Sequence, residues 1–328
     1  MKPALRLVVL AAAALGSILL ALRLGAVSLS LREVADGVRG VGDPTTVAIV
    51  QRLRLPRSVL AALVGGALAA SGATFQALLR NPLAEPYIMG VSGGAAVGAV
   101  AAIVVGGAAA SGVAVAACAF AGATAAILLV FRVAASVGRQ LDTRVLLLAG
   151  VVVGVFFTSC IHLLLTFADT ETFRSAFFWM MGSFSGATWR AIATLGSVMV
   201  PALAILFALA RPLNLFAVGE ETAAFLGVRV ERAKLLAYGT ASLLTAAAVA
   251  VSGVIGFVGL VVPHVVRMTW GGDHRFLLPA SVLTGATFLV LADALARTVA
   301  SPAELPIGVV TSFVGVPFFV YLLRRRRA

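Results

Sequence analysis

The sequence predicts an all-α integral membrane protein with about ten transmembrane helices. Apolar residues fill 61% of the 328 positions and charged residues only 12%, whereas soluble domains carry about 25% charged residues. The apolar residues also form long runs, and a helix of about 20 residues crosses the roughly 30 Å hydrocarbon layer of a bilayer. These observations assign residues 1–328 to a single transmembrane domain.

The apolar runs, divided at charges and at glycine or proline breaks, give the limits of the spans. The clearest run, Ser58 to Leu79, holds no charge and lies between Arg54 and Arg57 on one side and Arg80 on the other. Arginines at these ends reach the lipid headgroups, which avoids a cost of about 2.5–3.5 kcal/mol at the bilayer centre. The predicted spans are 5–24, 56–79, 92–110, 112–132, 144–167, 191–210, 235–252, 254–270, 276–296 and 307–323.

Three decisions about these spans rest on weaker signals. Lys2 followed by the apolar run 7–22 could be a secretory signal peptide, but the run is long and no small-residue cleavage site follows it. We therefore interpret it as the first span. The divisions near residues 110 and 253 rest only on Gly-rich and Ser-Gly turns.

An even number of spans places both termini on one side of the membrane. Lys2, Arg6 and the tail 324–327 make that side the cytoplasm under the positive-inside rule. An outward cluster of arginines in the segment 25–57 opposes the rule and indicates an acidic partner outside. This cluster consists of Arg32, Arg39, Arg52, Arg54 and Arg57.

The net charge of +12 does not indicate nucleic acid, because the basic residues are scattered between apolar runs instead of gathering on one face. We interpret the charge as a signal of topology and of contact with membrane lipid. Cys118 and Cys160 lie in apolar runs without a thiol or histidine at ligand spacing, so we expect small buried apolar side chains.

After Arg80 the sequence Asn81-Pro82-Leu83-Ala84-Glu85-Pro86 cannot continue a regular helix, because each proline restricts the residue before it. An ordinary loop and a functional gate explain this segment equally well. Together with R-L-P-R at 54–57 and G-V-S-G-G-A at 90–95, it resembles the permease subunit of the iron-chelate and vitamin B12 ABC importers, the FecCD/BtuC-like family. The resemblance covers nearly the whole chain.

The resemblance implies a type II ABC importer permease fold in a bacterial inner membrane. It further implies a homodimer, two ATP-binding cassette subunits and an extracytoplasmic substrate-binding protein. Together they would move a bulky metal chelate (a ferric siderophore, cobalamin or haem) by alternating access. The chain itself is expected to bind no cofactor or metal and to be no enzyme, with ATP used by the partner subunit.

The residues of the chain agree with this division of labour. Its two lysines, Lys2 and Lys234, lie outside any P-loop motif. The sequence also shows no nucleophile-base set and no metal-ligand cluster. The alternative is an ion- or proton-coupled secondary transporter, which would carry buried ionisable residues near mid-membrane. Only Asp293 comes close, and it lies near the predicted outer end of its span.

The resemblance assigns binding-protein docking to Arg54, Arg57 and Arg297. The last of these ends the A-D-x-x-A-R motif at 292–297, where Asp293 precedes Arg297 by four residues and can pair with it on one helix face. The alternative is that these arginines only anchor helix ends.

The resemblance places ATPase coupling in the polar cytoplasmic loop 211–234. Gly219 precedes two acids that fit the first turn of a short helix, and Gly227 is suited to end that helix. The family's G-E-x-A-x-x-L-G motif falls on Gly219, Glu220 or Glu221, Ala223 or Ala224, Leu226 and Gly227. A merely solvated loop is the alternative.

Two further segments are predicted to form the gate and the transport path. Asn81, Pro82 and Leu83, together with Thr143 at the start of the fifth span, face the cytoplasm and are candidates for an inner gate. The segment 179–189 matches the family's W-x-x-G-S-x-S-G-x-x-W, which lies beside its central pathway, although aromatic anchoring at the membrane interface explains the tryptophans equally well. The expected path residues are Trp179, Met180, Met181, Gly182 and Ser183.

The segments P-H at 263–264 and A-E-L-P-I-G-V-V-T at 303–311 also resemble the family. A lone histidine near a helix end is usually a structural, hydrogen-bonded group. We therefore assign no chemistry to His162, His264 or His274.

Overall fold

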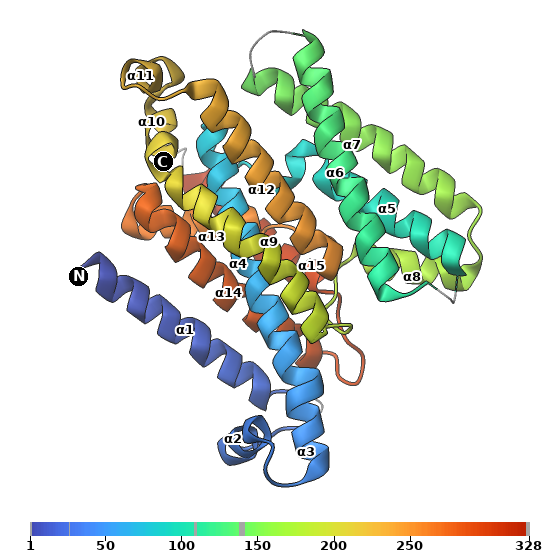
Figure 1. Ribbon diagram of the computed structural model, residues 1–328. Helices are drawn as coiled ribbons and strands as arrows, with labels where there is room; N and C mark the ends of the chain where they lie inside the picture. Colours follow the sequence, from blue (N-terminus) through green and yellow to red (C-terminus); the bar gives the residue numbers. More distant parts are fainter. Residues whose placement is uncertain (1, 26, 108–109, 138–141, 326–328) are drawn as a thin grey trace.

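The computed structural model describes residues 2–25, 27–107, 110–137 and 142–325, and within these ranges the ordered elements are all helices (Figure 1). Each predicted span coincides with one helix. These ten helices are α1 (Pro3–Arg23), α4 (Leu55–Leu78), α5 (Val91–Gly106), α6 (Gly112–Val137), α7 (Thr143–Thr166), α9 (Trp189–Ala208), α12 (Val230–Ser252), α13 (Val258–Trp270), α14 (His274–Thr298) and α15 (Ile307–Arg325).

Shorter helices lie between them. They are α2 (Leu31–Arg39), α3 (Pro44–Ala48), a π-helical turn (Ile49–Arg54), a 3-10 turn (Pro86–Met89), α8 (Thr170–Met180), α10 (Ala210–Val218) and α11 (Glu220–Phe225).

Helix length separates the ten helices into two groups. Within the described ranges, seven helical segments are long and apolar enough to cross a membrane, the one that contains α4 running from Pro44 to Leu78. By contrast, α5 has 16 residues, α13 has 13, and the apolar part of α15 covers only Ile307–Val320. The number of ten crossings therefore stays a prediction.

The expected division at residue 253 exists, but the start of the next helix at 254 is wrong. Residues 253–257 are non-helical, and we call this segment the break. Gly253 has a φ of 71° and Phe257 a φ of 68°. This left-handed backbone ends one helix and delays the next, so α13 begins at Val258.

Helix α4 runs through the middle of the molecule and packs against α12, α13 and α14 (Figure 1). Its glycines let the backbones touch, because lipid supplies no hydrophobic force to bring helices together and close packing must do so. A Cβ atom on Gly65 would lie 2.2 Å from the Gly285 carbonyl oxygen, and one on Gly72 would lie 1.9 Å from the Gly259 oxygen. Side chains larger than hydrogen are excluded at both crossings.

Helices α5 to α8 form a second group of helices beside α12 (Figure 1). There α5 and α6 cross in the same manner, since a Cβ atom on Gly94 would lie 2.4 Å from the Gly122 oxygen. The small residues near the start of α5 permit this backbone contact. The expectation of buried cysteines is wrong for Cys118, which is exposed on α6, while Cys160 is half-buried. On a membrane helix, an exposed apolar face is covered by lipid.

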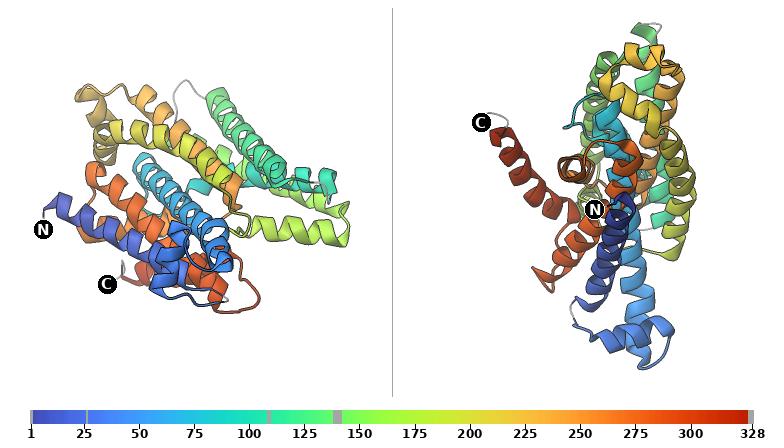
Figure 2. Two further views of the ribbon diagram at one scale, coloured as in Figure 1. Left: turned by 60° about the horizontal axis from the view of Figure 1, so that its bottom comes forward. Right: turned by 90° about the vertical axis from the view of Figure 1, so that its left-hand side faces the viewer.

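The two ends of the bundle carry different short elements. Helices α10 and α11 lie at one end, and α2 and α3 at the other (Figures 1 and 2). Helix α1 begins and α15 ends toward the α10–α11 end. This arrangement is compatible with termini on one side, although their cytoplasmic location stays a prediction. Arg326 and Arg327, used in that prediction, lie outside the described residues.

We predict that Gly65→Ala destabilises the protein by about 1–3 kcal/mol, because the added methyl group overpacks the crossing of α4 and α14. The matched control is Gly196→Ala on α9, where no atom lies within 4 Å of the added Cβ. That control should be neutral or stabilising, since alanine favours helix over glycine. Thermal unfolding of the detergent-solubilised proteins measures both, and equal melting temperatures for the two variants would contradict the packing argument.

Candidate functional site

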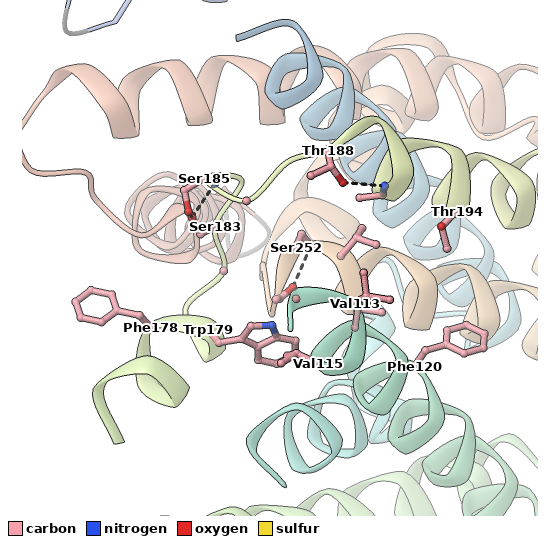
Figure 3. A pocket seen from close by; sticks show the side chains of 18 of the residues that line it. Val113, Val115, Phe120, Phe178, Trp179, Ser183, Ser185, Thr188, Thr194 and Ser252 are labelled. Carbon is pink, nitrogen blue, oxygen red and sulfur yellow. Dashed lines mark hydrogen bonds between the residues drawn. The ribbon is translucent and has the colours of Figure 1, made fainter. Parts of the chain in front are cut away.

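A cavity of about 1020 Å³ opens between α6, α8, α9 and α12, next to the 304–306 segment (Figure 3). Trp179 and Phe120 lie on one wall, and Ser183, Ser185 and Thr188 lie on the opposite side. The lining is mostly apolar, with a few hydroxyl groups and the charged residues Arg190 and Glu304. Such a surface accommodates a bulky ligand while offering few groups that would hold it tightly.

The five predicted path residues divide between two cavities. Trp179, Gly182 and Ser183 line the larger cavity. Met180 and Met181 instead line a second cavity of about 600 Å³, which is bordered by α15 and by the break. The predicted path segment therefore contributes to two separate surfaces.

Backbone hydrogen bonds explain why the chain turns sharply after α8. Gly182 has a φ of 74°, which favours glycine. The Ser183 amide donates to the Ser252 carbonyl at 2.8 Å, and the Gly308 amide donates to the Met181 carbonyl at 3.0 Å. Residues 179–183, which we call the path turn, are thus fixed between the end of α12 and the start of α15.

The predicted gate residues form a compact turn after α4. The Leu83 amide donates to Asn81 Oδ1 at 3.0 Å, and the Pro82 carbonyl lies 3.3 Å from His264 Nδ1. Thr143 is the first residue of α7, and its hydroxyl group is buried. The structure supplies a local framework for these residues, while their role as a gate stays a prediction.

The same loop also contacts the break, through Glu85 and Tyr87, two residues that the sequence analysis does not assign to the site. Glu85 Oε1 accepts a hydrogen bond of 2.7 Å from the Phe257 amide. The Tyr87 hydroxyl donates to the Ile255 carbonyl at 2.8 Å and accepts from the Ile255 amide at 3.1 Å. Burial raises the pKa of the Glu85 carboxyl, and the bond from Phe257 partly offsets that rise. The sequence signal that could have indicated the role of Glu85 is an acidic residue between two prolines in a mostly apolar chain.

The three arginines expected at an outer docking surface are buried. Arg54 is 6% exposed, Arg57 9% and Arg297 8%. The Arg54 guanidinium donates to the backbone carbonyls of Leu22, Arg23 and Val27. These interactions hold α1 against the start of α4.

Arg57 and Arg297 share a buried carboxylate. Asp293 is 1% exposed, lying 2.9 Å from Arg57 Nη2 and 3.2 Å from Arg297 Nε. The predicted pairing of Asp293 with Arg297 is confirmed. Glu304, which lines the large cavity, also pairs with Arg57 at 3.0 Å. Each guanidinium takes internal partners in this structure, while the assignment of Arg54, Arg57 and Arg297 to binding-protein docking stays a prediction.

The loop 211–234 contains two short helices, α10 and α11, and we call this pair the elbow. Glu220 and Glu221 lie in the first turn of α11, as predicted, and Gly227 has a φ of 82° just beyond its end. Lys234 Nζ on α12 lies 3.0 Å from Glu220 and holds the elbow in place. Ala223 is buried, whereas Leu226 and especially Phe225, at 91%, are exposed.

A second contact holds the elbow to α14. The Asn214 amide group of α10 donates to Asp273 Oδ1 at 2.7 Å and accepts from the His274 amide at 2.8 Å. The bond from Asn214 lowers the pKa of Asp273. His274 therefore has a structural hydrogen-bonding role, consistent with the assignment of no chemistry.

Comparison with known proteins decides the family. The family model described as the FecCD transport family matches residues 12–325. The chain belongs to the FecCD transport family. As a FecCD member it is a permease subunit of an ABC importer and a multi-pass protein of the cell membrane.

Named relatives agree with this membership. The FecCD chain is 48% identical over 286 residues to the cobalamin import system permease protein BtuC of Halobacterium salinarum, covering 87% of this chain and 76% of that protein. It is 41% identical over 284 residues to the vitamin B12 import system permease protein BtuC of Escherichia coli, covering 87% and 86%.

Solved structures agree as well. An inward-facing metal-chelate type ABC transporter matches with a TM-score of 0.86 and 32% identity over 98% of this chain and 99% of the other. PsaBC from Streptococcus pneumoniae in complex with Fab matches with a TM-score of 0.58 and 17% identity over 89% and 95%. The second match supports the fold alone.

We predict that Asp293→Asn destabilises the protein by about 3–5 kcal/mol, because it leaves the buried charges of Arg57 and Arg297 without their shared counter-charge. Glu304→Gln is the matched control, since the Glu304 side chain is 46% exposed and loss of a partly solvated pair costs about 0–1 kcal/mol. Thermal unfolding in detergent compares them. Similar losses of stability for both variants would contradict the role of Asp293 as the shared counter-charge of the two arginines.

Proposed function

We propose that this FecCD permease imports cobalamin, as a homodimer with two ATP-binding cassette subunits and an extracytoplasmic binding protein. The observation that carries the cargo is the 48% identity with a cobalamin permease across 87% of this chain. The mostly apolar cavity of about 1020 Å³ supports a bulky cargo. Ferric siderophores and haem are the competing cargoes.

The elbow of α10 and α11 is the proposed surface for the ATPase. Phe225 and Leu226 expose apolar side chains at the end of the bundle away from α2 and α3. An exposed aromatic side chain is a typical anchor for a pocket on a partner protein. Gly219, Glu220, Glu221, Ala223 and Gly227 shape the elbow, and Glu220 transmits its movement to α12 through Lys234.

Alternating access would follow from ATP binding in the partner subunits. A movement of the elbow would tilt α12 and α14, to which it is held by Glu220 and Asn214. The path turn and the gate residues at 81–83 would then open in alternation. The rival mechanism, coupling to protons or ions, gains no support from Asp293, because two arginines neutralise it.

Transport assays in proteoliposomes test the mechanism. The permease, with its ATPase subunits and binding protein, should accumulate radiolabelled cyanocobalamin only when ATP is enclosed with the ATPase. A proton gradient without ATP should drive no uptake. Uptake driven by the gradient alone would favour a secondary transporter, and ATP-dependent uptake of a ferric siderophore instead of cobalamin would change the cargo but not the mechanism.

Docking of the binding protein is predicted to use the arginines that the structure leaves exposed at the α2–α3 end, namely Arg32, Arg39 and Arg52. Changing all three to Glu should weaken binding by about tenfold or more at low salt, because it reverses the charge of the steering surface. The matched control changes them to Lys, which keeps the charge. The Kd from biolayer interferometry at two ionic strengths measures the effect, and unchanged binding by the Glu variant would exclude this surface.

A further inference from the structure

The break at residues 253–257 lies between the two segments that the transport cycle must coordinate. One is the loop at 79–90, which contains the predicted gate residues. The other is the path turn at 179–183. The two segments are separated by about 100 residues in the sequence, yet both are hydrogen-bonded to the break or to the residue before it.

On the gate side, the loop holds the break by its backbone. Tyr87 makes two hydrogen bonds with Ile255, and Glu85 accepts one from Phe257. Phe257 has a left-handed backbone that is unfavourable for a bulky residue. The Glu85 bond stabilises this conformation at the start of α13. The Pro86 ring packs below it, since a Cβ atom on Gly259 would lie 2.6 Å from Pro86 Cδ.

On the path side, contact is equally close. The Ser183 amide donates to the Ser252 carbonyl at 2.8 Å. A Cβ atom on Gly253 would lie 2.2 Å from the Trp179 carbonyl oxygen, and one on Gly182 would lie 2.7 Å from Ile255 Cγ1. Ile255 is therefore bonded to the gate loop and packed against the path turn at the same time.

We propose that Glu85 and Tyr87 are positioning residues that join the gate loop to the path turn through the break. A shift of the gate loop displaces Ile255 and Phe257 through these hydrogen bonds. Because Ile255 packs directly against Gly182, a displacement of the break also displaces Gly182. The gate loop and the path turn consequently change together. This inference rests on the proposed ATP-driven cycle and names the residues that link these two segments.

The test measures the response of the gate loop and that of the path turn separately in the same complex. In a background with Cys118→Ala and Cys160→Ala, Leu83→Cys reports on the gate loop and Ser183→Cys on the path turn. Each permease, purified with its ATPase subunits in lipid nanodiscs, is labelled with a polar maleimide with and without Mg-AMP-PNP. In the otherwise unchanged protein, nucleotide should alter the labelling rate at both positions.

Tyr87→Phe should keep the response at Leu83→Cys but reduce the response at Ser183→Cys by about fivefold or more, because both hydrogen bonds to Ile255 are lost. Glu85→Gln should retain more of the response than Glu85→Ala, since an amide oxygen still accepts from Phe257. This rescue also provides a second variant if Tyr87→Phe folds poorly.

The matched control is Ser71→Ala, which removes a buried interhelical hydrogen bond of 3.0 Å to the Ala241 carbonyl without touching the break. It should leave both responses unchanged. Full responses at both positions in Tyr87→Phe and Glu85→Ala would overturn the inference, as would an effect of Ser71→Ala as large as theirs. No response to nucleotide at either position in the otherwise unchanged protein would overturn the proposed ATP-driven function, and with it the inference.

Discussion

Direct contact between helix backbones is the constraint on which this fold depends. In a bilayer, apolar side chains gain little by leaving lipid, so helices associate through close packing and polar interactions. Helix α4 meets α13 and α14 at Gly72 and Gly65, where a methyl group would collide with a carbonyl oxygen. These contacts fix the position of α4. They thereby place Arg57, near the start of α4, and the loop that follows Leu78 at its end.

Charge pairing is the second constraint, because a buried ion is costly without a partner. Asp293 sits between Arg57 and Arg297, and Lys234 sits beside Glu220. The first group ties α4 to α14 at one end of the bundle, and the second ties the elbow to α12 at the other. Ionic contacts thus fasten the two regions that are proposed to meet soluble partners, while the middle of the bundle relies on packing.

The sequence was sufficient to locate the long apolar helices, because bilayer thickness sets a length that apolar runs reveal, but not the start of α13, which the left-handed backbone of Phe257 delays to Val258. It also indicated the elbow, since acids and glycines mark the ends of short helices locally. It did not reveal that Arg57 is buried, because its partner Asp293 lies 236 positions away. For the same reason it missed Glu85 and Tyr87, whose partners are 172 and 168 positions away. Exposure of Phe225 likewise depends on tertiary packing.

The short length of α13 has a consequence for the backbone that precedes it. Thirteen residues span about 20 Å, which is less than the roughly 30 Å thickness of a hydrocarbon layer. Just before this helix, the peptide groups of Ile255 and Phe257 take the side chains of Tyr87 and Glu85 as hydrogen-bond partners. Non-helical backbone in a membrane protein requires such internal partners, because acyl chains offer no hydrogen bonds.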